Sequence, residues 1–172
     1  IPPPVGSNIS TIELVAYVIS GDEQRFRERL KEMAGEFKAD PDEWWPTLSN
    51  LWQAMILSFD NPAPLTEDRL KLLHVTVMKD LIEQPGNYRT RDVTAAASSV
   101  MYLPHGKVSE RVPVLLNFAE EKFQNLPTPS LTWPLALGAL FFSEYLLIHP
   151  FIDGNGRTAR LVLSILLRGF TL

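Results

Sequence analysis

Apolar residues recur along most of this chain at the spacing of three and four that one face of a helix requires, so the pattern predicts a string of helices. Segments rich in proline and glycine separate these helices, beginning with IPPPVG at the amino terminus. Ser20, with a glutamate three residues later, and Thr66, with acidic residues directly after it, are expected to cap helices. The predicted helices cover about 10–19, 20–37, 44–57, 66–81, 109–123, 139–148 and 155–167.

One region departs from the helical pattern. Residues 84–108 are rich in turn-forming and β-branched residues, which predicts a short β-hairpin. We therefore expect a mainly α-helical protein with one hairpin. Trp44, Trp45 and Trp52 form an aromatic stripe on their helix, which we interpret as packing between helices rather than as a ligand site.

Composition narrows the classes of function. A chain of 172 residues with 45% hydrophobic residues fits one domain, or a domain with a helical extension. The formal net charge of −4 argues against a large nucleic-acid-binding surface. The chain has no cysteine, which excludes disulfides and thiol nucleophiles and is compatible with the cytoplasm, where we expect the protein. No apolar run reaches the roughly 18–20 residues that span a bilayer, so no membrane association is expected.

The segment HPFIDGNGRTAR, residues 149–160, holds most of the candidate chemistry. It lies between two apolar helical runs and supplies one imidazole, one carboxylate, one amide, two glycines and two arginines. The second helix is expected to begin near Asn155 or Gly156, so that its free N–H groups and positive dipole end face an anion. This arrangement predicts a nucleotide-phosphate site.

Three side chains of the segment offer distinct polar chemistry. His149 can be neutral near pH 7 and can accept a proton from an attacking hydroxyl. Asp153 offers hard oxygens that suit a Mg²⁺ ion carried on phosphates. Asn155 can donate a neutral hydrogen bond to a phosphoryl oxygen.

The glycines and arginines complete the predicted phosphate site. Gly154 and Gly156 lack Cβ, so the backbone can approach a phosphate closely. Arg157 and Arg160 lie three residues apart on one helical face, and both can fork onto phosphate oxygens. A calcium loop starting at Asp153 is rejected, because its sixth and twelfth positions, which need glycine and glutamate, are Thr158 and Ser164.

The segment resembles the signature of the Fic family, HxFx(D/E)GNGRxxR, at every fixed position. The resemblance covers about 63–172 and implies a Fic-type helical bundle with a short β-hairpin flap over the active-site loop. We accordingly expect an N-terminal helical extension over 1–62 and a Fic core domain over 63–172. Fic proteins with the intact motif mostly act as nucleotidyltransferases that move AMP from ATP to a Ser, Thr or Tyr hydroxyl of a target protein.

The resemblance also assigns roles within the motif. It implies that His149 is the general base and that Asp153 holds Mg²⁺. Phe151 is expected to anchor the loop by packing. The phosphates of ATP are expected to contact five residues: Gly154, Asn155 and Gly156 as an anion hole, Arg157 at the inner phosphates and Arg160 at the γ-phosphate.

Two further features follow from the resemblance. The second strand of the flap is expected to dock the target segment by strand addition, through Val100, Met101, Tyr102 and Leu103. Many Fic proteins inhibit themselves with a glutamate in the motif (S/T)xxxE(G/N), and Glu13 matches this motif in part, because its outer positions are Ile9 and Leu14. Glu13 is therefore either a degenerate inhibitory residue that pairs with Arg160 or an ordinary surface glutamate. A separate antitoxin protein and a homodimer are the other partners that the family implies.

Two alternatives to AMP transfer stay open. Some Fic relatives move UMP, phosphocholine or phosphate, and others remove AMP. A non-catalytic module that binds nucleotide or protein is the second alternative, and the unbroken motif argues against it because a pure binder has no need for His149.

Overall fold

The structure of this chain is a computed structural model that describes residues 22–36, 41–60, 63–94, 101–126, 132–168 and 170. The chain divides into two compact units, Ile1–Trp52 and Gln53–Leu172, and each is described by itself.

The first unit holds α2 (Glu23–Glu36) and the beginning of α3 (Pro41–Asp60). Asp22 caps α2, since its Oδ1 accepts a hydrogen bond of 3.1 Å from the Arg25 N–H. The predicted cap at Ser20 is therefore wrong, because the helix begins at Glu23 and Asp22 directly precedes it. The Trp52 ring is buried 4.7 Å from the Phe26 ring, between centroids, as the packing interpretation of the aromatic stripe expects for this residue.

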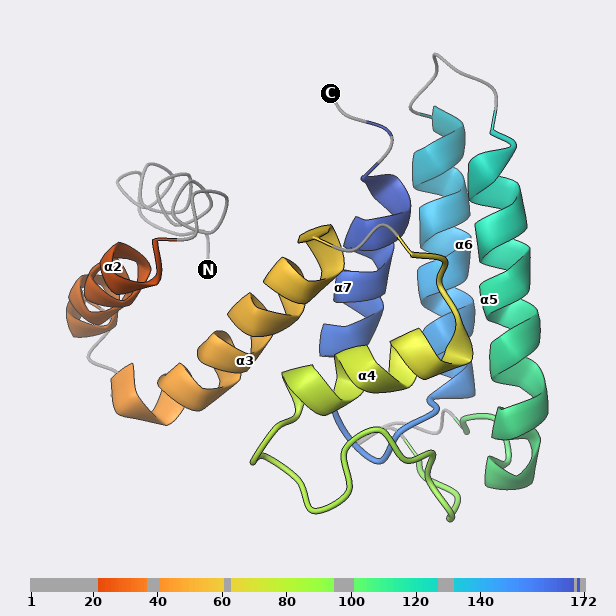
Figure 1. The fold of residues 1–172 in the computed structure, drawn as a ribbon. Helices are drawn as coiled ribbons and strands as arrows, with labels where there is room; N and C mark the ends of the chain where they lie inside the picture. The colour runs from red at the N-terminus through yellow and green to blue at the C-terminus, as the bar shows by residue number, and fades with distance from the viewer. Residues whose placement is uncertain are drawn as a thin grey trace. The chain divides into compact units, whose positions relative to one another are not determined.

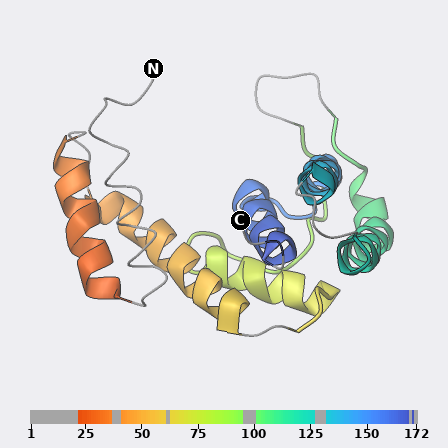
Figure 2. The ribbon, with the colours of Figure 1, turned by 90° about the horizontal axis from the view of Figure 1, so that it is seen from above.

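The second unit is a bundle of α4 (Glu67–Val77), α5 (Val108–Gln124), α6 (Thr132–Ile148) and α7 (Asn155–Leu167). In Figure 1, α5 and α6 run side by side in opposite directions, and Figure 2 views them end-on while α4 lies lengthwise. α6 packs against both α5 and α7, and its apolar residues continue onto its exposed side, which carries Trp133, Leu135, Leu140 and Leu147. The core draws on all four helices, and includes Leu70, Leu73, Val112, Leu116, Phe141, Tyr145, Ala159 and Val162. The expected mainly helical fold is confirmed.

Two of the predicted helix boundaries in this unit can be compared residue by residue. The cap at Thr66 is confirmed, because its hydroxyl accepts a hydrogen bond of 3.2 Å from the Arg69 N–H. The predicted end at Leu81 is wrong: α4 ends at Val77, and Asp80 in the following turn has the left-handed φ of 57°. Met78, directly after the helix, is buried.

The connection between α4 and α5 forms the region that the sequence predicts as a hairpin, and we call residues 88–107 the flap region. An isolated antiparallel bridge joins Thr94 to Met101, and residues 95–100, which include the predicted docking residue Val100, lie outside the described residues. The single-turn 3₁₀ helix η1 (His105–Lys107) ends the region. The Asp92 carboxylate joins the beginning and the end of the flap region. Asp92 Oδ1 lies 2.7 Å from the His105 backbone nitrogen and 2.9 Å from His105 Nδ1.

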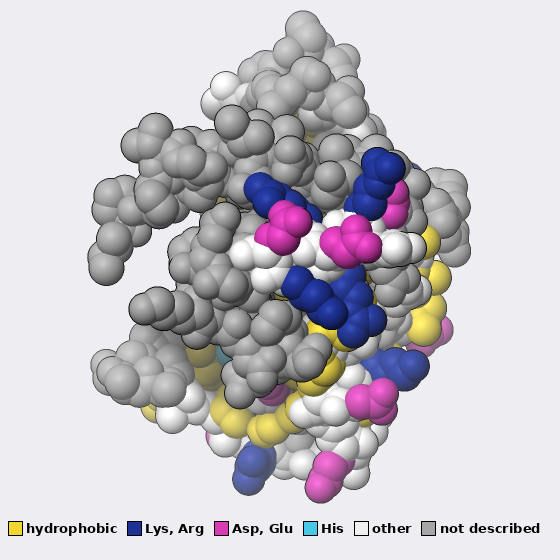
Figure 3. Space-filling view, turned by 90° about the vertical axis from the view of Figure 1, so that its left-hand side faces the viewer, with side chains coloured by type: hydrophobic (Ala, Val, Ile, Leu, Met, Phe, Trp, Pro, Cys, Tyr) yellow, Lys and Arg dark blue, Asp and Glu magenta, His cyan; other side chains and the backbone are white. Residues whose placement is uncertain are grey.

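The described surface carries charges of both signs. Figure 3 shows Lys and Arg interspersed with Asp and Glu on one face of the molecule. Among the described residues, no helix combines the length and the apolar character needed to cross a membrane. The predicted boundary between an extension and a core at residue 62 stays a prediction, while the two compact units meet within α3.

Candidate active site

The loop between α6 and α7 begins with a strained residue. The His149 N–H donates a hydrogen bond of 2.9 Å to the Tyr145 carbonyl oxygen and so closes α6. His149 has a φ of 49°, in the left-handed region that a helix end usually gives to glycine. This conformation costs a non-glycine residue about 1–2 kcal/mol, and strain of this kind gathers at functional sites.

Phe151 and Asn155 hold the middle of the loop in shape. The Asn155 side chain accepts a hydrogen bond of 3.0 Å from the Phe151 N–H and donates one of 2.8 Å to the Phe151 carbonyl oxygen. Both residues are buried. The Phe151 carbonyl oxygen takes one of the two amide N–H donors, so the expectation that the Asn155 amide donates to a phosphoryl oxygen stays a prediction.

His74 on α4 contacts the same loop through one ring nitrogen and its ring face. The Gly86 N–H donates to His74 Nδ1 at 2.8 Å, so the ring proton sits on Nε2, which donates to the Asp153 carbonyl oxygen at 2.9 Å. The ring is 1% exposed and stacks on Phe151 at 3.6 Å between centroids. Burial lowers the pKa of His74, which keeps it neutral in this role. The sequence favours packing over catalysis for this residue but gives no sign of its contact with the loop.

Gly154 sets the start of α7. Its φ is 76°, and a Cβ at this position would overlap the Met78 sulfur, so both conformation and space require glycine. The first hydrogen bond of α7 runs 2.9 Å from the Thr158 N–H to the Gly154 carbonyl oxygen. The N–H groups of residues 155–157 precede that bond and have no acceptor within the helix, which makes the beginning of α7 suited to an anion.

Two arginines and one carboxylate surround the beginning of α7. Asp153 is 65% exposed; its Oδ1 accepts a hydrogen bond of 2.6 Å from the Gly154 N–H, and its Oδ2 lies 3.6 Å from Arg157 Nη2. The Arg160 guanidinium reaches back over Gly156, where a Cβ would lie 3.6 Å from its Nη1. Within the described ranges, the Arg160 side chain has no hydrogen-bond or ion-pair partner. Two cationic forks thus flank the free N–H groups.

The His149 side chain presents one nitrogen to the site. Its Nδ1 lies 3.3 Å from the Leu146 carbonyl oxygen, which can only accept a hydrogen bond, so the ring proton is on Nδ1. Nε2 then carries a lone pair, as a general base requires. Burial lowers the pKa of the ring, and the positive charge of Arg89 acts in the same direction.

Arg89 joins the flap region to the loop. Its side chain is 0% exposed and donates hydrogen bonds to four backbone carbonyl oxygens: His149 at 2.7 Å, Arg91 at 3.0 Å, Ile148 at 3.2 Å and Leu103. Its own N–H also donates to the Pro150 carbonyl oxygen at 2.9 Å. The sequence gives no signal for this role, since an arginine in a turn-rich segment is usually exposed.

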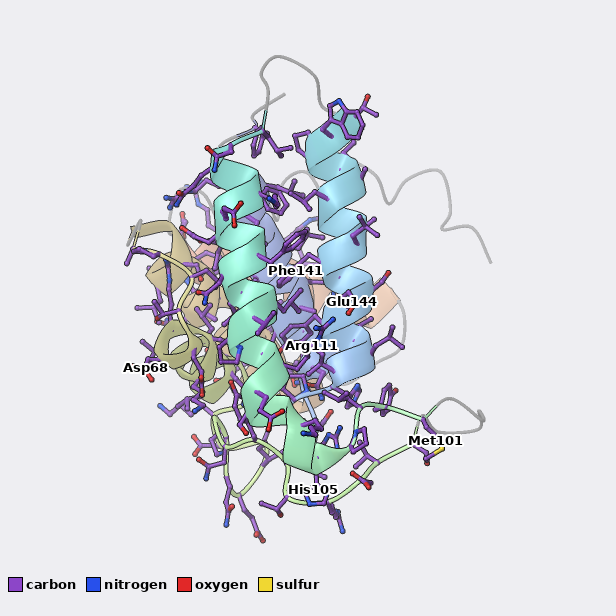
Figure 4. All side chains as sticks on the ribbon, turned by 90° about the vertical axis from the view of Figure 1, so that its right-hand side faces the viewer. Asp68, Met101, His105, Arg111, Phe141 and Glu144 are labelled. Carbon is purple, nitrogen blue, oxygen red and sulfur yellow. The ribbon has the colours of Figure 1, made fainter. Side chains whose placement is uncertain are left out.

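A cavity of about 640 Å³ is lined by the flap region, α5 and the end of α6. Met101, Tyr102 and Leu103 of the flap region form one wall. Figure 4 shows Arg111 of α5 and Glu144 of α6 above the flap region, and their side chains approach to 3.6 Å at the rim of the cavity.

The structure therefore brings most of the predicted site residues together. His149, Asp153, Gly156, Arg157 and Arg160 lie in or directly after one loop, and the described part of the predicted docking segment lies beside it. Glu13 lies outside the described residues, so its predicted pairing with Arg160 stays a prediction. Across the ranges that the structure describes, no group of three His, Asp or Glu side chains could hold a metal by itself.

Fold and site together define a helical domain with a histidine at the end of one helix and, within the described residues, backbone N–H groups without an acceptor at the start of the next. The model of the Fic/DOC family matches residues 64–167, which is more than half of the chain. The chain belongs to the Fic/DOC family.

Individual relatives agree with this result. A Fido domain-containing protein of Dictyostelium discoideum is 33% identical over 90 residues, which are 52% of this chain and 59% of that protein. The crystal structure of a Fic domain containing signaling protein from Bacteroides thetaiotaomicron superposes with a TM-score of 0.59 at 26% identity, over 72% of this chain and 47% of that one. A Fic family protein from Desulfovibrio desulfuricans has a TM-score of 0.55 at 21% identity, over 98% of this chain and 60% of that one, and shows the fold alone. The chain thus spans between about half and three-fifths of the length of these relatives.

Proposed function

We propose that this chain transfers AMP from MgATP to a Ser, Thr or Tyr hydroxyl of a target protein. The observation that supports this proposal best is the arrangement of the loop: a histidine with a free Nε2 at one end and free helix N–H groups between two arginines at the other. One end has the chemistry to accept a proton, and the other has the chemistry to bind a polyphosphate.

The acceptor hydroxyl would be activated by His149. Nε2 takes the hydroxyl proton while the oxygen attacks the α-phosphorus in line, and the bond to the β-phosphate oxygen breaks to release pyrophosphate. The tautomer fixed by Leu146 keeps Nε2 unprotonated before the step. Burial of the ring, which lowers its pKa, favours the neutral base near pH 7.

The phosphates would bind at the beginning of α7. The backbone N–H groups of residues 155–157 bind phosphoryl oxygens, Arg157 reaches the inner phosphates and Arg160 the γ-phosphate. Charge that develops on the α-phosphoryl oxygens would be stabilised by donors already in place, which is the larger part of catalysis in such transfers.

Asp153 fits a magnesium ion that arrives with ATP. Mg²⁺ usually keeps several waters and takes one or two carboxylates together with substrate phosphates, so a single exposed carboxylate is a sufficient protein contribution. When bound, the ion would neutralise phosphate charge and orient the leaving pyrophosphate.

The expected partner is a target protein that docks beside the flap region. Met101, Tyr102 and Leu103 are the described residues of the docking segment. Glu13 would inhibit the enzyme by pairing with Arg160, and a separate antitoxin or a homodimer would add further control.

Intact-mass spectrometry with MgATP and a cell lysate tests the proposal. The wild type is compared with Glu13→Gly, with His149→Ala, and with His105→Ala as a matched control at an exposed histidine outside the loop. We expect one AMP-sized increment per modified site in the wild type and in His105→Ala, none in His149→Ala, and a stronger signal in Glu13→Gly if Glu13 inhibits.

A different mass increment, seen with UTP or a choline-containing donor, would show that this donor rather than ATP is the substrate. Tight ATP binding without an adduct from either wild type or Glu13→Gly would contradict AMP transfer and favour a binding module.

A further inference from the structure

Tyr102 covers one face of the His149 ring. The two rings lie 3.8 Å apart between centroids and within 16° of parallel. The tyrosine comes from the flap region and the histidine from the end of α6, so residues 47 positions apart meet face to face.

Backbone contacts on both sides of Tyr102 hold it in place. The Leu103 N–H donates a hydrogen bond of 2.9 Å to the Leu147 carbonyl oxygen, and the Leu103 carbonyl oxygen accepts one from Arg89. On the other side, Met101 forms the antiparallel bridge with Thr94. The segment that bears Tyr102 is thus tied to α6, from which His149 also emerges.

Among the described residues, the other contact that restrains the His149 ring is a hydrogen bond to the Leu146 carbonyl oxygen. Its Nδ1 contact with Leu146 is long, at 3.3 Å, and a hydrogen bond at one ring nitrogen still permits the ring to swing about that contact. A stacked ring removes this freedom, because rotation of the imidazole out of its plane would collide with the tyrosine. The contact with Leu146 and the stack with Tyr102 together define one orientation.

We propose that Tyr102 is a positioning residue, whose ring holds the His149 imidazole in the orientation in which Nδ1 donates to the Leu146 carbonyl oxygen and Nε2 faces the acceptor hydroxyl. The inference deepens the proposed AMP transfer and rests on it for the catalytic consequence. The positioning itself is a property of the free protein and can be measured without any reaction.

A purely structural role for Tyr102 fits the surroundings less well. The side chain is only half-buried and lines the cavity of about 640 Å³, so part of its surface borders open space. It is absent from the buried core that stabilises the bundle. Replacement by a smaller apolar residue therefore removes the stack while leaving the helices in contact.

The face of the tyrosine ring also suits the reaction. An aromatic face is negative, and it attracts the positive imidazolium that forms when His149 takes the hydroxyl proton. The other charged groups that act on the ring are Arg89, which opposes the imidazolium, and Asp153, which favours it. Phenylalanine keeps this face, whereas leucine loses it.

Tyr102→Phe and Tyr102→Leu separate the ring from its hydroxyl. Long-range nitrogen–proton NMR correlations in the full chain, assigned with His149→Ala, report which ring nitrogen of His149 carries the proton. We expect the Nδ1–H pattern in wild type and Tyr102→Phe, and a mixture of tautomers in Tyr102→Leu. Phe118→Leu, the same kind of change at a ring of α5 that is 46% exposed and lies outside the flap region, is the matched control and should match wild type.

Steady-state AMP transfer provides the second readout. Tyr102→Leu should lower kcat by about 10- to 100-fold with little change in the KM for ATP, because a misplaced base slows chemistry rather than nucleotide binding. Tyr102→Phe should retain most of the wild-type kcat. An unchanged tautomer pattern in Tyr102→Leu, or equal losses of kcat in both variants, would overturn the positioning role. A tautomer change in a protein that transfers no AMP would support positioning and refute the proposed function instead.

Discussion

The two sides of the loop between α6 and α7 differ in how completely their polar groups are satisfied. On the side toward α4, Asn155 and His74 use both of their side-chain hydrogen-bonding ends, and Phe151 is fully buried between them and the core. On the open side, and within the part of the chain that the structure describes, neither His149 Nε2 nor the Arg160 guanidinium, which ends over the beginning of α7, has a hydrogen-bond partner.

A histidine therefore has a different role on each side of the loop. His74 and His149 are both neutral rings near Asp153, yet the partners of their nitrogens make the first a support and the second a candidate base. Substitutions on the side toward α4 should lower stability and activity together. Substitutions on the open side should lower activity alone.

The largest effect is expected from His149→Ala. Loss of a general base costs roughly 10²–10⁴-fold in rate, whereas the half-buried ring contributes little to the core. Measured on the same preparation, the transfer rate should fall by at least 10²-fold, while the affinity for ATP should be retained. Unchanged transfer in this variant would remove His149 from the chemistry.

Arg89→Met should cause the next largest loss, about 3 kcal/mol in the free energy of unfolding. Four carbonyl oxygens around a fully buried guanidinium would lose their donors, and unsatisfied buried acceptors are costly. Urea unfolding measures the loss, and Arg91→Met at the exposed neighbouring arginine is the control. Equal unfolding midpoints for the two variants would show that Arg89 does not hold the loop.

Asn155→Ala and Arg160→Ala compare the two sides directly. Asn155→Ala removes two buried hydrogen bonds and should cost about 2 kcal/mol of stability. Arg160→Ala should change stability by less than about 0.5 kcal/mol and weaken ATP binding, as calorimetric titration would show. A reversed ranking in stability would contradict the assignment of the two sides.

A smaller effect is expected from pH. Burial lowers the pKa of His74 below the ordinary 6.5, so the folded protein binds this proton less readily than the unfolded chain. Its contribution to stability is complete above pH 6.5 and declines as pH falls from 6.5 toward the lower folded pKa, by at most about 1.4 kcal/mol per pH unit. Urea unfolding at pH 7.5 and 5.5 should show a smaller decline in His74→Gln than in wild type. Identical declines would mean that His74 does not oppose protonation in the fold.

Apolar spacing predicts most of the described helices because it reflects the core directly, but α6 begins at Thr132 rather than near 139, and the predicted helix over 10–19 lies outside the described residues. The start of α7 at Asn155 and the cap at Thr66 follow from local residues and are confirmed. The end of α4 at Val77 does not follow from local residues, and Met78 after it is buried beside Gly154, far along the chain. Within the candidate site, the motif identifies the loop, but the contacts of Asn155 and Arg89 depend on neighbours that no local spacing encodes.

The most direct test of the proposed chemistry uses two preparations of ATP, one with radioactive phosphorus at the α-position and one with it at the γ-position. AMP transfer predicts that the α-label becomes attached to protein, that the γ-label does not, and that His149→Ala attaches neither. Attachment of the γ-label would mean phosphate transfer, and absence of both labels in wild type and Glu13→Gly would contradict AMP transfer by this chain.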